Sequence, residues 1–506
     1  MRTIGTSPLG IREVLEIARG EVRVELDADP AYRSRLVRAR EAVERAQDLG
    51  REVYGVTTGV GASSGVPIPR ALREELASNL MRFHGCGTGR SLDALESAAA
   101  LAVRLVSLAR GHSGVRAILL ERMCELLNDR VLPRIPEEGS VGASGDLTPL
   151  SYLAALIAGE REATLGGRVV PASEALAAVG LEPIALAPKE SLALMNGTAV
   201  MTAIACVDWE RAARLARLAA AITAMVVDVT RGNPGHFDPR ISELKPHPGQ
   251  RLCAEWIRAD LVLDPGVAEP EPARLQDRYS LRCAPHVIGV LVDALDVSRR
   301  MLEIEINAVD DNPLVDPDTG EILHGGNFYG GHVCFAMDGL KTALASVADL
   351  LDRQLALMCV PETSGGLPAN LVAVEDVSHH GFKAMQISAS ALTAEALKLT
   401  MPASAFSRST ESHNQDKVSM GTIAARDCRR ILELTETVAA IVLLGACQAV
   451  DLRSAEGGAR RRFALHEAVR KAAPTLGEDR RMDCDIERVL EMLRSDALPL
   501  EAFSHV

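Results

Sequence analysis

Long runs of helical periodicity are the feature that most restricts the fold of this 506-residue chain. Apolar residues recur at three- and four-residue spacing over eight segments, which predicts helices that bury one face. Some of these segments reach 20 to 35 residues, so we expect a mainly α fold built on a bundle of long, nearly parallel helices. Alternating strand patterns are few, and residues 168–170 are a short candidate. The expected helices cover residues 71–82, 92–110, 115–129, 198–230, 287–307, 336–360, 381–399 and 417–452.

Aromatic residues are scarce, since Phe, Tyr and Trp together make up only 3% of the chain. The apolar share is nevertheless an ordinary 47%, so the core must consist of Ala, Leu, Val and Ile. A composition of this kind suits closely packed helices, which agrees with the periodicity.

Charge, cysteine content and hydropathy exclude several classes of protein. The net charge of −13 argues against nucleic acid as a partner, because nucleic acid selects a basic face. The ten cysteines contain no CxxC pair, so we expect neither a zinc site nor a redox dithiol, but reduced thiols in a cytoplasmic protein. The longest apolar runs, residues 218–227 and 438–447, are about half the ~20 residues that cross a bilayer, so no membrane partner is expected.

Four glycine clusters interrupt the helical pattern. Glycine permits positive φ and close backbone approach, so such loops suit a ligand or unusual backbone chemistry. The clusters are GVTTGVGASSG (55–65), GCGTG (85–89), GSVGASG (139–145) and GGNFYGG (325–331).

The cluster at 139–145 does not match the familiar glycine-rich loops. A phosphate-binding loop needs a Lys after its last Gly, and a nucleophile elbow needs a Gly two residues after its Ser; Asp146 occupies both positions. A dinucleotide-binding fingerprint would follow a strand of a βαβ unit, which the pattern does not indicate.

Ala143-Ser144-Gly145 supports a different chemistry. The amide nitrogen of Gly145 can attack the carbonyl carbon of Ala143 and close a five-membered ring, and a side chain at position 145 would hinder that approach. Loss of one water from the ring and one from the Ser144 side chain leaves an exocyclic methylidene. The result is an electrophile made from backbone.

The segment GSVGASGDLTPLSYLA (139–154) resembles the signature of the aromatic amino acid ammonia-lyases and aminomutases, whose Ala-Ser-Gly becomes a methylidene-imidazolone prosthetic group. The resemblance continues in family order through most of the chain. The further motifs are YGVTTGVG (54–61), NLMRFHGCGTG (79–89), ALMNGT (193–198), KPHPGQ (245–250), QDRYSLRCAPHVIG (276–289), INAVDDNPL (306–314), LHGGNF (323–328) and NQDKVSMGTIAAR (414–426).

This resemblance implies a fold and an activity. The fold is the long-helix bundle of the ammonia-lyase (fumarase/aspartase-like) type with a loop-rich N-terminal domain. That domain is expected over residues 1–197, with the prosthetic group and the catalytic Tyr loop, and the bundle and C-terminal helical region over 198–506. The activity is elimination of ammonia from an L-α-amino acid to give an α,β-unsaturated acid.

By the same resemblance, Tyr54 is the base that removes the β-proton. A phenol has an ordinary pKa of ~10, so its anion must be stabilised locally for it to act near neutrality. Backbone N–H groups of the glycine-rich loop that follows Tyr54 are suited to that role.

Other family roles fall on polar residues of the later motifs. Arg282 matches the arginine that binds the substrate carboxylate, a role that suits its planar fork. Tyr279, three residues earlier, shares its face if the segment is helical, and is expected near the amine and the prosthetic group. Asn196 and Gln276 match amides that hold the ring oxygen and the polar end of the substrate.

Two further motifs match the lining and the support of the pocket. Phe328 matches the pocket loop HGGNF, whereas Asn312 and Asp146 are expected to support loops rather than to take part in the chemistry.

Two positions carry most of the discrimination between substrates in this family, the pair 83–84 and residue 415. Phe83-His84 occupies the selectivity pair, where Phe83 makes the pocket apolar and His84 can hydrogen-bond a para-hydroxyl. Gln415 is neutral where histidine-specific members have a Glu, and Glu411 matches a Glu near the substrate amine of phenylalanine ammonia-lyases. We therefore expect tyrosine or phenylalanine as the substrate, with tyrosine ahead and coumarate or cinnamate as the product. Histidine ammonia-lyase activity giving urocanate, and aromatic 2,3-aminomutase activity, are the alternatives.

The implied cofactor is the methylidene-imidazolone formed autocatalytically from Ala143-Ser144-Gly145, with no metal and no pyridoxal phosphate. The implied partners are a small aromatic amino acid and further copies of the chain. The family architecture is a homotetramer in which each active site draws residues from three chains.

Overall fold

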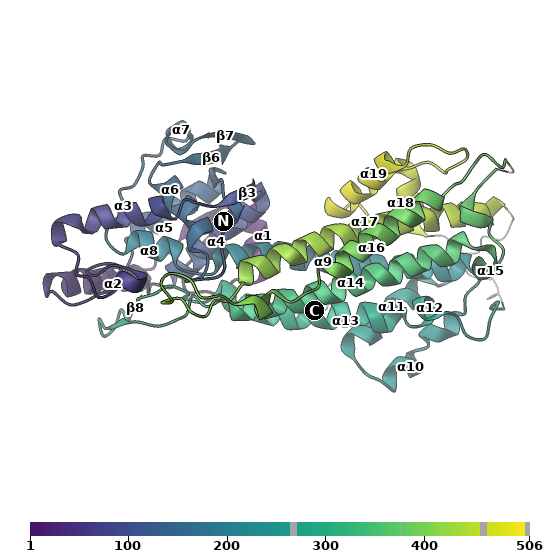
Figure 1. Cartoon of the computed structure of the whole chain (residues 1–506), viewed down its shortest axis with the longest axis horizontal. Helices are drawn as coiled ribbons and strands as arrows, with labels where there is room; N and C mark the ends of the chain where they lie inside the picture. The colour runs from purple at the N-terminus through teal and green to yellow at the C-terminus, as the bar shows by residue number, and fades with distance from the viewer. Residues whose placement is uncertain (264–270, 375, 456–462, 501–506) are drawn as a thin grey trace. The chain divides into compact units, whose positions relative to one another are not determined.

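The computed structural model describes residues 1–263, 271–374, 376–455 and 463–500. It is mainly helical, as the periodicity predicts, and most of its helices and some of its strands are labelled in Figure 1. The contacts divide the chain into two units. Unit 1 consists of Met1–Val207, Arg299–Asp338 and Pro402–Arg426, and unit 2 of Asp208–Ser298, Gly339–Met401 and Asp427–Val506. The whole segment 1–197 therefore falls in unit 1, together with two segments from much later in the chain.

Unit 1 packs short helices and small sheets. Its helices are α1 (Ile11–Arg19), α2 (Pro30–Asp48), α3 (Arg73–Phe83), α4 (Ala94–Ala109), α5 (Ala117–Asn128), α6 (Leu147–Ile157), α7 (Ala172–Ala178) and α8 (Glu190–Met195). Its strands are β1 (Arg2–Ile4), β2 (Val24–Leu26), β3 (Thr88–Ser91), β4 (Leu132–Pro133), β5 (Pro136–Glu138), β6 (Glu162–Leu165), β7 (Arg168–Pro171), β8 (Leu314–Val315) and β9 (Ile322–Leu323).

The sheets of unit 1 are small. β1 and β2 pair in parallel, and the other pairs, β3–β5, β4–β6–β7 and β8–β9, are antiparallel. The β6–β7 hairpin, which includes the predicted strand at 168–170, turns through Gly166 and Gly167. Both glycines have positive φ, of 57° and 77°, which is the requirement of a two-residue turn that follows the strand twist.

Helix α4 forms the centre of the unit 1 core, and the sequence explains both its start and its burial. Asp93 accepts a hydrogen bond from the Glu96 N–H at 2.8 Å and Glu96 accepts one from the Asp93 N–H at 3.1 Å, which is a capping box. The run of alanines and leucines that follows is buried on every face, and α1 and α5 pack against it.

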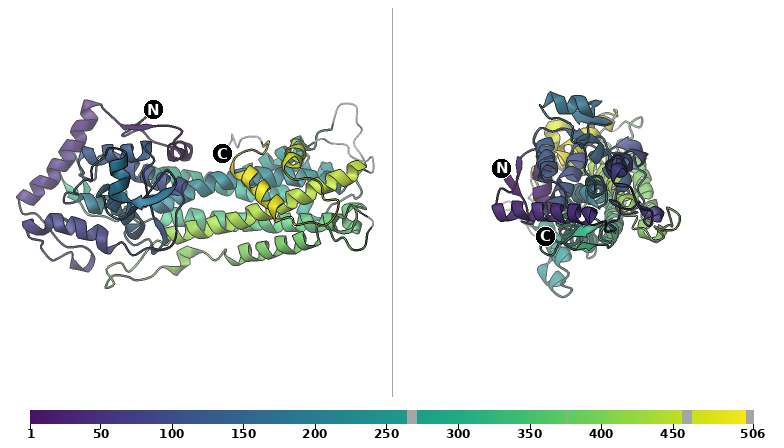
Figure 2. Two further views of the ribbon diagram at one scale, coloured as in Figure 1. Left: turned by 90° about the horizontal axis from the view of Figure 1, so that it is seen from above. Right: turned by 90° about the vertical axis from the view of Figure 1, so that its left-hand side faces the viewer.

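Unit 2 is built on long helices. Its elements are the distal parts of α9 (Ala199–Val229), α13 (Ala284–Ile306), α14 (Gly331–Cys359) and α17 (Gly421–Ala455), with α10 (Pro239–Glu243), α11 (Pro248–Asp260), α12 (Tyr279–Arg282), α15 (Pro361–Ser364), α16 (Lys383–Lys398), α18 (Ala464–Ala472) and α19 (Asp483–Arg494). The long helices run side by side in unit 2 (Figures 1 and 2).

Polar contacts also connect the long helices within unit 2. Trp209 of α9 donates to the Leu295 carbonyl of α13 at 2.8 Å, and Gln354 of α14 donates to the Thr223 hydroxyl of α9 at 2.9 Å. The core between them is rich in small residues such as Ala216 and Ala219, which accounts for the scarcity of aromatic side chains.

Helix α17 is the one helix among the described residues that is long and apolar enough to cross a membrane, and 89% of its apolar window is buried inside the structure. A core helix of a soluble protein shows the same combination of composition and burial.

Candidate active site

A cavity of about 120 Å³ in unit 1 brings together residues from distant parts of the sequence. Seven of the residues predicted for the site line it: Tyr54, Phe83, His84, Ser144, Asn196, Glu411 and Gln415. The rest of the wall consists of Val60, Gly61, Leu80, Leu147, Leu192 and Met195, so the lining combines polar side chains with apolar ones.

The Ala143-Ser144-Gly145 tripeptide lies in a tight turn beside this cavity. Ser144 has a φ of 50° and Gly145 one of 75°, both in the left-handed region. Gly145 lies so close to Gly197 that a Cβ at position 145 would be 2.0 Å from the Gly197 carbonyl oxygen. Only glycine fits at position 145, as the proposed ring closure also requires.

Asp146 ties this turn to the start of α9. Its backbone N–H donates to the Gly197 carbonyl at 2.7 Å, and its buried carboxylate accepts from the N–H groups of Val200 and Met201 at 3.0 and 2.8 Å. The carboxylate therefore caps the first turn of a 31-residue helix from outside that helix. Burial raises the pKa of Asp146 to about 6, although these hydrogen bonds and one from Thr422 oppose the shift. The expected role of Asp146 as a support is thus confirmed.

Asn312 has a comparable supporting role. Its side-chain oxygen accepts a hydrogen bond from the Gly325 N–H at 2.8 Å, so it holds the start of the HGGNF loop.

The residues around the tripeptide fit a methylidene-imidazolone. Asn196 is buried, and its side-chain oxygen has no hydrogen-bond partner although it belongs to the cavity wall. A buried amide oxygen needs a hydrogen-bond donor, and a substrate amine can be that donor, whereas the ring oxygen would accept from the amide nitrogen of the same side chain. Gly142 also lies against Ser419, whose hydroxyl would be 2.1 Å from a Cβ at position 142, so the backbone there is closely enclosed.

Tyr54 has the predicted backbone donor. Its phenolic oxygen accepts a hydrogen bond from the Gly61 N–H at 2.8 Å, within the glycine-rich loop. Burial nevertheless raises the pKa of Tyr54, and the nearby Glu411 carboxylate adds to the increase. The single N–H donor therefore does not by itself offset the burial of the phenol.

Glu411 connects a second loop to the Tyr54 loop. Its carboxylate accepts from the Ala62 N–H at 2.9 Å, and a Cβ at Gly61 would be 2.3 Å from the same carboxylate. Glu411, Ser412 and His413 all have positive φ, between 48° and 62°, so the loop that presents the carboxylate has a strained backbone.

Phe83 and His84 end helix α3 at the cavity. Their rings are 4.2 Å apart between centroids, and Phe83 is 58% exposed. The Nδ1 atom of His84 is 2.8 Å from the Leu80 carbonyl, which accepts only, so Nδ1 carries the proton. Burial and the Arg161 charge lower the pKa of His84. The neutral imidazole therefore keeps Nε2 as a hydrogen-bond acceptor.

Gln415 faces the tripeptide. Its side-chain nitrogen donates to the Ser144 hydroxyl at 3.4 Å and its oxygen accepts from the Thr410 hydroxyl at 3.1 Å. The amide thus contacts the residue that would lose its hydroxyl in forming the prosthetic group.

Six predicted residues do not line this cavity: Ala143 and Gly145, which flank Ser144 in the turn, and four residues from later in the chain. Phe328, in the HGGNF loop of unit 1, is half-buried. Gln276, Tyr279 and Arg282 belong to unit 2, where Gln276 and Tyr279 are exposed and Tyr279 has 70% of its surface accessible. Helix α12 places Tyr279 and Arg282 on one face as predicted, since the guanidinium lies 4.5 Å from the centre of the Tyr279 ring.

Sequence reasoning did not single out Ser140, Thr422 or Gly197. The Ser140 hydroxyl accepts from the Gly142 N–H at 3.2 Å and from the Thr422 hydroxyl at the same distance, so it closes the turn from inside. Thr422 lies 276 residues from Asp146, its other partner, and no local pattern indicates that contact.

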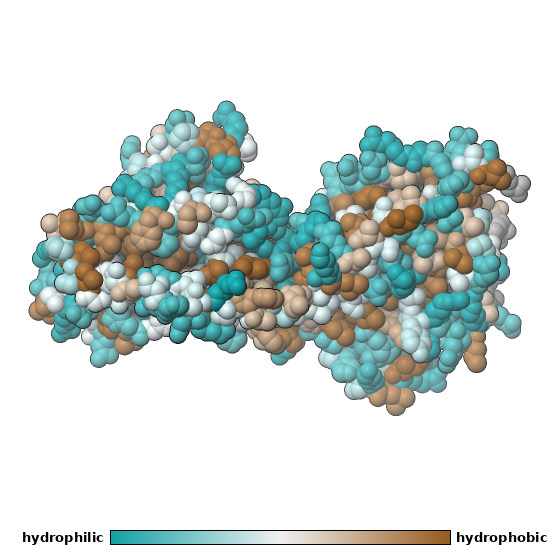
Figure 3. All heavy atoms as spheres, in the orientation of Figure 1, coloured by the Kyte–Doolittle hydropathy of each residue, from teal (hydrophilic) through white to brown (hydrophobic). Residues whose placement is uncertain are grey.

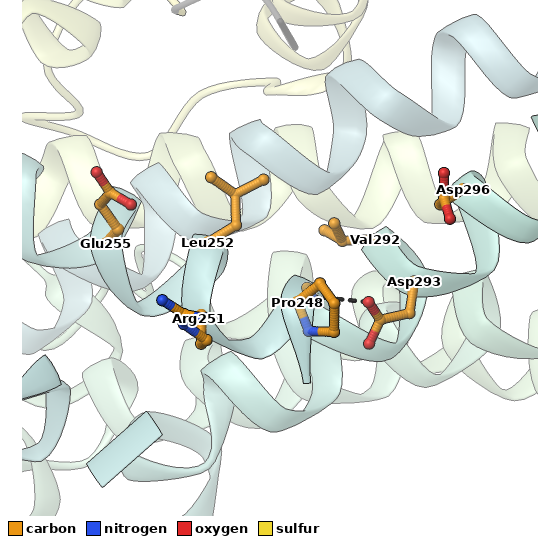
Figure 4. Close-up of a pocket in the computed structure, with 8 residues that line it drawn as sticks. Pro248, Arg251, Leu252, Glu255, Val292, Asp293 and Asp296 are labelled. Carbon is orange, nitrogen blue, oxygen red and sulfur yellow. Dashed lines mark hydrogen bonds between the residues drawn. The ribbon is translucent and has the colours of Figure 1, made fainter. Parts of the chain in front are cut away.

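Unit 2 contains a second, larger hollow of about 490 Å³ between α11 and α13 (Figure 4). Glu255, Asp293, Asp296 and Arg251 lie along it, and Asp293 accepts a hydrogen bond from the Gly249 N–H at 2.7 Å. None of the residues predicted for catalysis or binding lines this hollow, so it is not the candidate active site.

Comparison with known proteins identifies the family of the chain. A model of the aromatic amino acid lyase family matches residues 9–471. The histidine ammonia-lyase of Gloeobacter violaceus is 40% identical over 496 residues, which is 98% of this chain and 96% of that relative. Histidine ammonia-lyase from Trypanosoma cruzi superposes with a TM-score of 0.88 at 34% identity over 98% of this chain and 94% of that one.

Tyrosine aminomutase from Streptomyces globisporus superposes equally well, with a TM-score of 0.89 at 35% identity over 98% of this chain and 97% of that one. These matches confirm the fold class and the resemblance found in the motifs. The chain belongs to the aromatic amino acid lyase family and is a carbon–nitrogen lyase.

Proposed function

We propose that this chain eliminates ammonia from L-histidine to give urocanate. The observation that carries the proposal is its similarity, over 98% of its length, to a histidine ammonia-lyase at 40% identity. The sequence favours tyrosine or phenylalanine and gives histidine as an alternative, so the relatives support the alternative better than the first choice.

The cavity offers an imidazole substrate a suitable hydrogen-bond acceptor. His84 lines the wall with its Nδ1 proton donated to Leu80, so Nε2 accepts from a ring N–H. The same acceptor would serve a phenol, but a phenyl ring offers it no donor. His84 thus favours substrates that carry a polar hydrogen on the ring.

At the level of the sequence, the lack of a carboxylate at position 415 argues against histidine as the substrate. The position of Glu411 in the structure weakens that argument. Its carboxylate belongs to the same cavity wall and is held by the Ala62 N–H at 2.9 Å. An imidazole or an ammonium group in the cavity therefore has an acidic partner from a different segment of the chain.

Ala143-Ser144-Gly145 would form the prosthetic group, and Asn196 and Gln415 would hold it. When formed, the group supplies an electrophilic carbon that turns the substrate amine into a leaving group. Tyr54 would accept the β-proton at its phenolic oxygen, with the Gly61 N–H stabilising the anion. The raised pKa of Tyr54 means that the bound substrate or further residues must help to stabilise the phenolate.

Gln276, Tyr279 and Arg282 would complete the site from other copies of the chain in a homotetramer. Arg282 would bind the substrate carboxylate through its planar fork. Exposed apolar side chains on the helices of unit 2 support an association of this kind (Figure 3). Val290 and Val297 of α13 are 58% and 42% exposed and, seven residues apart, share one face.

The ten free cysteines support a cytoplasmic location.

Tyrosine is the second candidate. Phe83 and the neutral Gln415 favour a larger, uncharged ring, and the superposed tyrosine aminomutase supports both that substrate and transfer of the amine to the β-carbon.

The test is to incubate the purified protein separately with histidine, tyrosine and phenylalanine and to follow the absorbance of urocanate, coumarate and cinnamate. Faster formation of urocanate is expected. Coumarate or cinnamate without urocanate would refute the proposal, and β-amino acid without free ammonia would establish a mutase.

A further inference from the structure

Arg161 makes an unusual set of contacts at the end of helix α3, just before the Phe83-His84 pair. Its guanidinium donates to the Met81 carbonyl and, at 3.4 Å, to the Arg82 carbonyl. The last carbonyls of a helix have no partner within the helix, and the cationic Nη2 donor of Arg161 suits them in charge. Arg161 therefore closes the C-terminus of α3.

The guanidinium is itself held in place from the other side. It donates to the Ser151 hydroxyl at 3.0 Å, and it lies over the Tyr152 ring at 4.4 Å from the ring centre. Both residues belong to α6, the helix that begins two residues after Gly145 and packs against α3 (Figure 1). Arg161 thus connects α6, which follows the Ala-Ser-Gly tripeptide, to α3, which ends at the Phe83-His84 pair.

Gly85 provides space for this arrangement. A Cβ at position 85 would be 2.0 Å from the Arg161 Nη2 atom and 2.4 Å from Cζ. The backbone of Gly85 lies outside the left-handed region, so the glycine is explained by the approach of the guanidinium and not by backbone strain.

The position of the His84 ring depends on this closure. Its Nδ1–H bond goes to the Leu80 carbonyl in the last turn of α3, the turn that Arg161 holds. If that turn frays, the imidazole loses the partner that fixes its tautomer, and Nε2 is no longer presented to the cavity as an acceptor.

We propose that Arg161 is a positioning residue for substrate recognition. Its Nη2 atom, on the carbonyls of Met81 and Arg82, and its Nη1 atom, on the Ser151 hydroxyl, hold the His84 acceptor in place and so set the preference for substrates with a polar hydrogen on the ring. This proposal rests on the function proposed above, since it concerns the same cavity. No direct contact of Arg161 with the substrate is involved, because Arg161 is not part of the cavity wall.

The first experiment measures KM and kcat of Arg161→Ala for histidine, tyrosine and phenylalanine. Loss of one hydrogen bond to the ring, about 1.4 kcal/mol, predicts an approximately tenfold higher KM for histidine and tyrosine, with kcat and the KM for phenylalanine changed less than twofold. Where phenylalanine is not converted, inhibition by cinnamate replaces its KM. A uniform loss of kcat on every substrate, with the same ratios of KM, would assign Arg161 a merely structural role and overturn the proposal.

Three further variants separate the fork from its charge and from general instability. Arg161→Lys keeps the charge but loses the fork, and is expected to resemble Arg161→Ala. Gly85→Ala leaves Arg161 in the chain but displaces its guanidinium, and is expected to change the KM ratio in the same direction. Arg82→Ala, the matched control, removes only the exposed ion pair of Arg82 with Glu160 at 2.6 Å and is expected to leave the ratios within twofold.

A crystal structure of Arg161→Ala tests the proposal without any substrate. The expected result is a frayed last turn of α3 and a displaced His84 ring, and an unchanged turn with the Nδ1–Leu80 contact intact would overturn the proposal. A wild-type protein that converts none of the three amino acids would instead refute the proposed function and leave this structural result to decide the role of Arg161.

Discussion

Gly145→Ala is the substitution for which the structure gives the clearest energetic expectation. Gly145 has a φ of 75°, and a Cβ there would lie 2.0 Å from the carbonyl oxygen of Gly197, which is backbone and cannot rotate away. An L side chain in the left-handed region costs about 1–2 kcal/mol, and an overpacked group about 1–3 kcal/mol more. We therefore expect Gly145→Ala to lower the free energy of unfolding by about 2–5 kcal/mol.

Two matched glycines separate the strain from the collision. Gly166 has a φ of 57° with nothing within 4 Å of its Cβ position, so Gly166→Ala should cost only the strain. Gly65 has an open Cβ position and no positive φ. Gly65→Ala should therefore raise the free energy of unfolding by up to about 1 kcal/mol, because it lowers the conformational entropy of the unfolded chain. All variants are compared in a Ser144→Ala background, so that none of them can form the methylidene.

The assay is urea unfolding followed by far-ultraviolet circular dichroism at one protein concentration. The expected order of stability is Gly65→Ala, then Gly166→Ala, then Gly145→Ala. If Gly145→Ala came within about 0.5 kcal/mol of Gly166→Ala, the contact with Gly197 would not be as close as the structure has it, and the reasoning would be refuted.

Three more outcomes are expected. Ser144→Ala should keep the fold but abolish turnover, and its mass should show that the two water molecules of ring formation are retained; full activity would contradict the proposed prosthetic group. His84→Leu should raise KM for histidine and tyrosine about tenfold while sparing phenylalanine, because one hydrogen bond to the ring is lost, whereas equal KM changes for all three would argue against His84 as the acceptor. Burial raises the pKa of Glu305 to about 7, so the folded state takes up a proton before the unfolded state does as the pH falls from about 7. The free energy of unfolding should therefore rise by at most ~3 kcal/mol as the pH falls from about 7 to about 4.5. Glu305→Gln, which keeps an acceptor for the Thr198 hydroxyl, should flatten this dependence in thermal melts across that range. An unchanged slope would contradict Glu305 as the group that titrates.

The long helices could be predicted from the sequence because their apolar periodicity extends over many turns. The expected helix at residues 198–230 agrees within one residue at each end with α9 (Ala199–Val229). Helix α2 (Pro30–Asp48) was not predicted, since its narrow apolar stripe is interrupted by arginines and glutamates. The stability of a helix with so few apolar residues on one face depends on its packing more than on its own pattern.

The candidate site was predicted by residue type, but its geometry was not. The Tyr54 loop has the N–H donor that the glycines suggest, yet the rise in the pKa of Tyr54 comes from burial, which a sequence does not show. The contact of Glu411 with Ala62 spans 349 residues and could not be read from spacing, although it changes the argument about the substrate. Gln276, Tyr279 and Arg282 were grouped with the cavity residues by resemblance and belong to the other unit in the structure.

The double role of Asp146 limits how this chemistry can be transplanted. Its backbone N–H binds Gly197 and its carboxylate caps α9, so the ring-forming turn is held by a helix that starts more than fifty residues later. An engineer who grafted Ala-Ser-Gly-Asp into a loop of another protein would copy the reactive atoms but leave the restraint behind. A working graft would need a glycine facing position 145 and a helix start beneath the aspartate, and the smallest portable module is therefore two crossing segments rather than one peptide.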